Sequence, residues 1–140
     1  MRRERRMARQ LERSDHAPAT ARRALQQLVA DHPTAAPHMP MLKLLVSEIV
    51  TNAIVHPELA PGSQVGLEIA VGADCTRVLV SDAGPGFSPT DPQPRGPGAG
   101  GGYGLRLLEA GASRWGTSSA DGRFTVWFEL DHAEPLEKSA

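Results

Sequence analysis

A stretch dominated by glycine and proline interrupts the second half of the chain and most constrains how the chain can fold. From Gly84 to Gly104 the sequence GPGFSPTDPQPRGPGAGGGYG contains eight glycines and five prolines. Such a segment cannot form the interior of a helix or a strand. It is not an interdomain linker, because the roughly 40 residues after it are too few for an independent core. We therefore expect one domain with a long loop that covers something.

The segments on either side of this stretch carry clear periodic patterns. Apolar residues three and four apart predict helices, and strict alternation predicts strands. The predicted helices cover residues 19–33, 41–55 and 105–112, and the predicted strands cover 65–71, 76–81, 114–119 and 123–130. We expect an α+β fold of two layers, a mostly antiparallel sheet covered on one face by helices.

The predicted domain spans residues 15–131, with the stretch at about 84–104 as its lid. Residues 1–14 are expected to form either a basic arm or a first edge strand, because Met7, Arg9 and Leu11 alternate only faintly. A solvated arm is the simpler interpretation of so many arginines. Residues 132–140 are expected to be a polar tail.

Charge and composition exclude several classes of function. Residues 1–30 hold eight arginines and three acids, a net +5, whereas residues 31–140 hold seven basic and thirteen acidic groups, a net −6. The arginines could touch phosphates, but 4% aromatic residues leave little for base stacking, so no direct nucleic-acid role is expected. One cysteine forms no disulfide framework, and no apolar run is long enough to span a membrane. We expect a cytoplasmic protein.

The second predicted helix carries an unusual line of polar residues. Glu48, Asn52 and His56 are spaced four and four, so they share one side of the helix. An apolar stripe that faces a core runs beside them; it comprises Leu42, Leu45, Val46, Ile49 and Ala53. The polar line therefore lies at the edge of the buried surface, where a ligand could be held.

Both ends of the glycine-proline stretch have features of a binding loop. Asp82 follows a strand, where it could cap a turn or face a ligand. The segment GAGGGYGL runs into a helix, so its backbone N–H groups would lie beside the positive end of the helix dipole. It is not a Walker A loop, because no Gly-Lys-Ser/Thr occurs, and no parallel βαβ pattern indicates a Rossmann turn.

Taken together and in this order, the motifs resemble those of the GHKL ATPase superfamily, which has the Bergerat ATP-binding fold. The pieces are Glu48-x-x-x-Asn52-x-x-x-His56 on a helix, Asp82-x-Gly84-x-Gly86 after a strand, Gly102-x-Gly104-Leu105 opening a helix, and a Thr in the closing strand RFTVWFEL. Within the superfamily, the short chain is most similar to anti-sigma-factor serine kinases and their actinobacterial ATP-binding relatives. The resemblance covers roughly residues 18–130.

The resemblance implies roles in binding Mg-ATP. Asn52 would offer an amide oxygen to Mg²⁺, which bridges the phosphates. Asp82 would accept a hydrogen bond from the adenine amino group, and Gly84 and Gly86 would let the backbone pass close to base and ribose. Thr125 would place a hydroxyl near adenine, directly or through water.

The remaining roles concern the phosphates and the reaction. Gly102 and Gly104 would present N–H groups to phosphates, with Leu105 also among the nucleotide-binding residues. Glu48 is placed to act as a general base on a serine hydroxyl or water, or else is only a solvated carboxylate. His56 either contacts the nucleotide or merely ends the helix. Arg95 is the only cation of the lid; it either contacts the γ-phosphate or is a solvated arginine.

Two functions follow from the resemblance. In the first, the protein is a serine/threonine kinase that phosphorylates a serine of an antagonist protein, and the unphosphorylated antagonist releases a sigma factor. In the second, it is a nucleotide-binding interaction module without kinase turnover. The resemblance also implies a homodimer. A sensor histidine kinase fragment is disfavoured, because residues 1–40 are too short and proline-broken for two long dimerisation helices.

Overall fold

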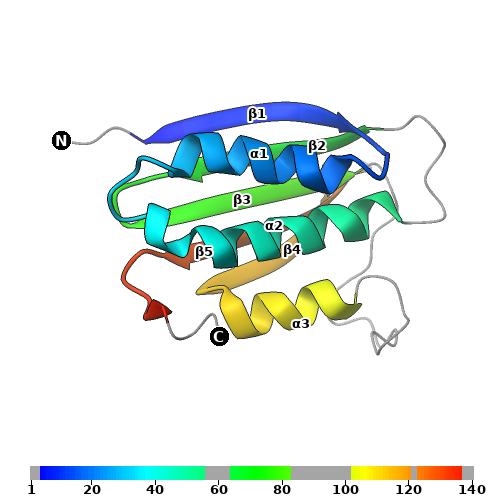
Figure 1. Cartoon of the computed structure of the whole chain (residues 1–140). Helices are drawn as coiled ribbons and strands as arrows, with labels where there is room; N and C mark the ends of the chain where they lie inside the picture. The colour runs from blue at the N-terminus through cyan, green and yellow to red at the C-terminus, as the bar shows by residue number, and fades with distance from the viewer. Residues whose placement is uncertain (1–3, 56–63, 83–101, 121–122, 137–140) are drawn as a thin grey trace.

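The fold is a five-stranded antiparallel sheet with its helices packed on one face. The computed structural model describes residues 4–55, 64–82, 102–120 and 123–136. The strands lie in the order β1-β2-β3-β5-β4, with β1 Arg5–Glu12, β2 Gln64–Val71, β3 Cys75–Asp82, β4 Arg114–Ala120 and β5 Arg123–Asp131. The helices are α1 Ala17–Val29, the 3₁₀ helix η1 Ala36–His38, α2 Met39–Ile54 and α3 Gly102–Gly111. Figure 1 shows α1, α2 and α3 side by side in front of the sheet, which confirms the predicted two-layer α+β class.

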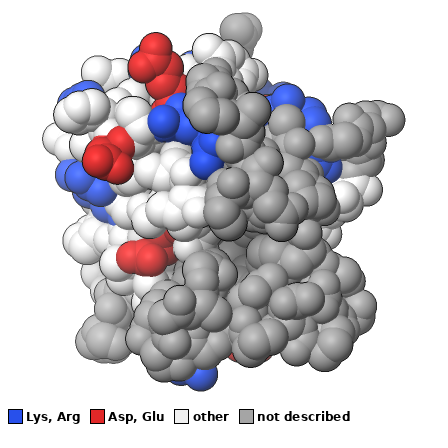
Figure 2. All heavy atoms as spheres, turned by 90° about the vertical axis from the view of Figure 1, so that its right-hand side faces the viewer, with Lys and Arg blue, Asp and Glu red and all other residues white. Residues whose placement is uncertain are grey.

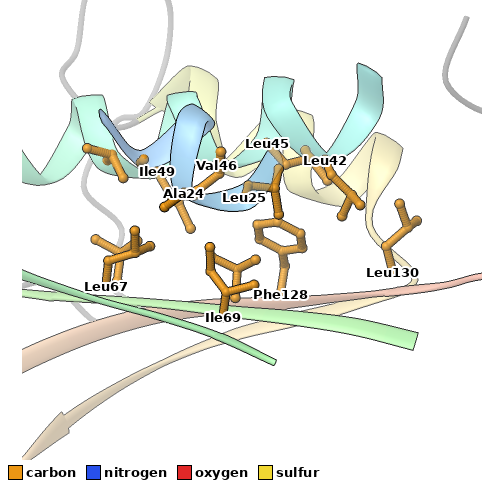
Figure 3. Close-up of a cluster of buried hydrophobic side chains, with 14 of the residues drawn as sticks. Ala24, Leu25, Leu42, Leu45, Val46, Ile49, Leu67, Ile69, Phe128 and Leu130 are labelled. Carbon is orange, nitrogen blue, oxygen red and sulfur yellow. The ribbon is translucent and has the colours of Figure 1, made fainter. Parts of the chain in front are cut away.

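The core lies between these two layers. Leucine, isoleucine and valine side chains from α1 and α2 point down onto the sheet, and Phe128 of β5 stands between them (Figure 3). Phe128, Leu25, Leu45 and Leu42 are each 0% exposed. Burial of such side chains stabilises the fold by about 1.5–3 kcal/mol each. This packing fixes which side of α2 meets the sheet.

Polar contacts then fix how α2 is rotated between its two neighbours. The guanidinium Nη1 of Arg22 on α1 donates to Ser47 Oγ on α2 at 2.8 Å. Arg13, after β1, donates from Nη2 to the carbonyl oxygen of Ile54 at 2.9 Å, where a cation offsets the negative end of the α2 dipole. Ser47 therefore faces α1, and the opposite flank of α2 is left for α3.

Of the two forms expected for the first residues, a basic arm or an edge strand, residues 5–12 take the second. Residues 5–12 form the edge strand β1, paired antiparallel with β2 from Arg5↔Val71 to Glu12↔Gln64, and not a solvated arm. Arg5 reaches across to the helix layer, donating to the carbonyl oxygen of Leu28 at 3.0 Å and pairing with Asp31. Strand pairing and these contacts outweigh the weak local alternation.

The start of the expected polar tail is part of the fold. His132 contacts Thr76 of β3 and Thr34 after α1, with ring nitrogen to hydroxyl distances of 2.8 and 2.9 Å. Ser113 Oγ donates to Glu134 Oε2 at 2.8 Å. A tail over 132–140 is therefore wrong at its first residues, because His132 and Glu134 contact side chains of other elements that sequence periodicity does not reveal.

Helix boundaries differ from the predictions at α3 and α2. Helix α3 begins at Gly102 rather than near residue 105, so it takes in the last residues assigned to the lid. Helix α2 begins at Met39 rather than at residue 41, and Pro40 lies in its first turn, where its missing N–H costs nothing. None of the helices in the described part of the chain is long and apolar enough to cross a membrane.

Candidate nucleotide site

Asp82 is the most informative side chain at the candidate site. It is the last residue of β3, and its position alternates in phase with buried Val78 and Val80, so its carboxylate lies on the helix-covered face. It is only 5% exposed. Burial of a carboxylate is costly unless hydrogen-bond donors surround it, so a buried acid at the end of a core strand is a candidate for ligand recognition.

Glu48 and Asn52 lie on the flank of α2 that faces α3. A Cβ added to Gly111 at the end of α3 would lie 2.6 Å from Met41 Sδ and 3.5 Å from Leu45 Cδ2, so this flank of α2 touches α3. Residues 41, 45, 48 and 52 are spaced four, three and four, and therefore continue along one side of the helix. Both Glu48 and Asn52 are half-buried. Glu48 and Asn52, the two described members of the polar line predicted from the sequence, thus lie on the side of α2 that contacts α3.

Helix α3 runs antiparallel to α2, as Figure 1 shows. Its C-terminal Gly111 packs near Met41, and its ten residues extend about 15 Å. The first turn of α3 therefore lies opposite the C-terminal half of α2, where Asn52 is. Gly102 and Gly104 belong to that turn, whose backbone N–H groups have no partners within the helix and carry the positive end of its dipole.

The structure does not bring Thr125 into this group, which corrects the expectation for the closing strand. Asp82 pairs with Phe124, and Ser81 pairs with Thr125. Successive side chains of a strand point to opposite faces, so Phe124 shares the helix-covered face with Asp82, while Thr125 lies on the outer face with Ser81. Arg123, which also alternates onto the outer face, donates to Ser81 Oγ at 3.4 Å and supports this assignment.

Phe124 is a candidate site residue that the sequence motifs did not indicate. It is 5% exposed and lies directly across from Asp82. The alternation of RFTVWFEL puts Phe124, Val126 and Phe128 on one face of β5, and the burial of Phe128 in the core shows that this face meets the helices. The alternation pattern therefore indicated that Phe124 is buried on the helix side, whereas the family motif indicated Thr125, the next residue.

Several predicted residues lie outside the described part of the chain. They are His56, Gly84, Gly86 and Arg95. Within the described residues no group of three or more His, Cys, Asp and Glu is placed to hold a metal ion. Figure 2 shows the side of the molecule that lies at the right of Figure 1, and the described residues on this side include both basic and acidic side chains.

Comparisons with known proteins identify a family and a similar solved structure. Residues 12–128 match the family of histidine kinase-like ATPase domains. The chain belongs to that family. Comparison with curated protein sequences gave no match.

A solved structure of another protein is also similar to this histidine kinase-like ATPase domain. The crystal structure of the RsbU and RsbW domains of Rv1364c from Mycobacterium tuberculosis matches with a TM-score of 0.67 and 19% identity over 90% of this chain. The chain spans 32% of the length of that structure. At this identity the match establishes the fold, which confirms the GHKL-type, Bergerat architecture expected from the motifs.

Proposed function

We propose that this domain binds Mg-ATP at the end of the sheet where Asp82, Asn52 and the first turn of α3 meet. The observation that carries the proposal is the buried carboxylate of Asp82 on the helix-covered face, 5% exposed, at the end of a core strand. A carboxylate there accepts a hydrogen bond from the adenine amino group. The family match over residues 12–128 supports a nucleotide as the ligand.

The phosphates would extend from the base toward Asn52 on α2 and the first turn of α3. The N–H groups of Gly102 and Gly104 suit phosphate oxygens, because they lie in the first turn of α3. Asn52 would hold Mg²⁺ through its amide oxygen, and the ion would neutralise phosphate charge. His56, Gly84, Gly86 and Leu105 are proposed to complete the nucleotide contacts, as the resemblance implies.

The reaction we propose is phosphoryl transfer to a serine of an antagonist protein in a sigma-factor circuit. The serine oxygen would attack the γ-phosphorus, the bond to the ADP oxygen would break, and Glu48 would accept the serine proton. Support comes from the place of Glu48 one turn before Asn52 on the flank facing α3, and from the fold shared with a structure that contains an RsbW domain. Partners would be the antagonist, a sigma factor and a second copy of the chain, in the cytoplasm.

The first test is calorimetric titration with Mg-ATP. We expect Asp82→Asn and Asn52→Ala each to weaken binding by more than about tenfold, the equivalent of one lost charge-assisted contact. Asp74→Asn is the matched control, because Asp74 is exposed at the turn between β2 and β3, at the other end of those strands. A folded wild-type protein that binds no Mg-ATP would overturn the proposed site.

The second test separates the kinase from a nucleotide-dependent interaction module. Transfer of labelled γ-phosphate to a candidate antagonist should fall by about 100-fold or more in Glu48→Gln with ATP affinity retained, because general base catalysis contributes that much. Glu68→Gln on the exposed outer face of β2 should behave as wild type. Tight Mg-ATP binding with no transfer by the wild type would favour the interaction module.

A further inference from the structure

Arg13 joins the end of β1 to the end of α2. It follows Glu12, the last residue of β1, and its Nη2 donates to the carbonyl oxygen of Ile54, the last residue of α2, at 2.9 Å. Arg13 is half-buried, so solvent screens this contact less than it would on the open surface. Figure 1 shows the end of β1 and the end of α2 at the same end of the fold as the start of α3. The contact therefore lies at the end of the molecule that carries the proposed nucleotide site.

The sequence leaves the end of α2 short of hydrogen-bond donors. The last carbonyl groups of a helix have no partners within it, and the residues that follow commonly supply some. Here Pro57 has no backbone N–H for the carbonyl of Ala53, and a proline disfavours helical geometry in the residue before it. Val55, which donates to the Thr51 carbonyl at 3.1 Å, makes the last helical bond of α2 among the described residues. Arg13 supplies a donor from outside the helix.

Asn52 belongs to the turn that Arg13 holds. It lies two residues before Ile54 and is half-buried. The contact from Arg22 to Ser47 lies more than one turn earlier, so it does not reach this last turn. A helix end that frays displaces its side chains, and Mg²⁺ tolerates little departure from octahedral geometry in its ligands. The direction of the Asn52 amide therefore depends on how firmly this turn is held.

We propose that Arg13 is a positioning residue of the nucleotide site. It holds the last turn of α2, and with it the Asn52 side chain, in the place where Mg-ATP binds. This inference rests on the proposed Mg-ATP site, and it adds to that site a residue that touches neither nucleotide nor metal. Arg13 acts on Asn52 through the helix backbone, in compensation for the donor that Pro57 removes.

The first experiment follows backbone hydrogen exchange in the nucleotide-free protein by nuclear magnetic resonance. Arg13→Met removes the donor and keeps a long side chain for packing. The Val55 amide, which reports on the last turn through its bond to Thr51, should exchange about fivefold faster or more. The Leu45 amide, on the core side of α2, should exchange as in wild type. Unaltered exchange at Val55 would overturn the inference without reference to any nucleotide.

The second experiment is a double-mutant cycle of Mg-ATP affinity, measured by calorimetry. Arg13→Met should weaken binding by about five- to twentyfold in the wild-type background, which is part of the worth of a hydrogen bond from a charged group. In the Asn52→Ala background the same change should cost less than about twofold, because the side chain that Arg13 positions is absent. Arg13→Lys keeps a cation that can donate to the Ile54 carbonyl, so its affinity should stay within about threefold of wild type.

Arg23→Met is the matched control. Arg23 is exposed on α1 and donates to Thr20 of the same helix at 3.4 Å, so its loss removes an equal charge without releasing α2. It should leave both the Mg-ATP affinity and the exchange of the Val55 amide unchanged. If Arg13→Met does not fold, Arg13→Gln, whose shorter side chain should not reach the Ile54 carbonyl, provides the same test.

The outcomes separate this inference from the proposed function. Folded wild-type protein that binds no Mg-ATP overturns the nucleotide site itself. If wild type binds and Arg13→Met costs the same factor in both backgrounds, Arg13 acts by its charge and not through Asn52. If folded Arg13→Met binds Mg-ATP as tightly as wild type, Arg13 positions nothing that the nucleotide needs. Either of these two results overturns the inference while the ATP site stands.

Discussion

At the scale of single residues, the hydroxyl of Thr117 has no hydrogen-bond partner among the described residues although it is buried. A buried hydroxyl without a partner costs about 1–3 kcal/mol. Thr117→Val keeps the shape and removes the hydroxyl, so it should stabilise the nucleotide-free protein by about 1 kcal/mol and raise the melting temperature by roughly 3 °C. Ser118→Ala, at the exposed next residue of β4, is the control for thermal melts. A lower melting temperature for Thr117→Val would show that the hydroxyl has a partner.

Gly116 is required by the close approach of Trp127. A Cβ at Gly116 would lie 2.9 Å from Trp127 Cζ2 and 3.0 Å from its Cε2 and Nε1. The indole also lies 5.2 Å from the Arg77 guanidinium, a cation–π contact. Gly116→Ala should therefore displace the ring and destabilise the protein by about 1–3 kcal/mol. Chemical denaturation measures the loss and near-ultraviolet circular dichroism the displaced indole; an unaltered spectrum and stability would contradict this packing.

At the scale of elements, a histidine cluster joins four segments at the end of the sheet away from Asp82. The ring of His132, after β5, contacts Thr76 of β3, Thr34 after α1, and the carbonyl oxygen of Ala73 in the β2–β3 turn. His38, which precedes α2, contacts the His132 carbonyl oxygen through Nε2 at 3.0 Å. The His32 and His38 rings lie 5.4 and 6.2 Å from the His132 ring.

This cluster predicts lower stability in acid. Burial, and then the neighbouring His38, lower the pKa of His132 below its usual 6.5, although the Ala73 carbonyl and the nearby carboxylates Asp74 and Asp131 oppose the shift. The unfolded chain therefore takes up this proton at a higher pH than the folded protein. Its contribution to stability is complete above about pH 6.5 and is lost as the pH falls toward the lowered folded pKa.

Thermal melts from about pH 8 to pH 5 measure this effect. His132→Gln should lower the melting temperature at pH 8, because it removes contacts to Thr34 and Thr76, and should flatten the pH dependence relative to wild type. His16→Gln is the matched control, since His16 is exposed at the start of α1. An equally steep acid loss in His132→Gln would assign the effect to other groups.

At the scale of the whole molecule, nucleotide binding should appear as stability. A ligand that binds only the folded state at 100 times its dissociation constant adds about 2.7 kcal/mol. For a chain of 140 residues this raises the melting temperature by about 8 °C. Chelation of Mg²⁺ should reduce the shift, and Asp82→Asn should abolish most of it at the same ATP concentration. A shift that survives Asp82→Asn in full would place the nucleotide elsewhere.

The sequence by itself determined every element except β1 and η1, and it indicated the main candidates for the site. The spacing of apolar residues, every 3.6 residues in a helix and every second residue in a strand, is a local property of the sequence. The three α-helices and strands β2 to β5 could therefore be assigned from it. The same local spacing put Glu48 and Asn52 on one side of α2, and the order of the motifs indicated the family that residues 12–128 match. These conclusions needed no knowledge of what packs against each element.

Tertiary structure decided which faces meet. Alternation separates Phe124 from Thr125, but only pairing with β3 and the burial of Phe128 show which of them shares a face with Asp82. A shift of one residue in register would exchange them. The strand β1 likewise exists because β2 offers hydrogen bonds and Arg5 finds the helix layer. The histidine cluster joins residues up to 98 apart, and contacts at that separation leave no periodic trace in a sequence.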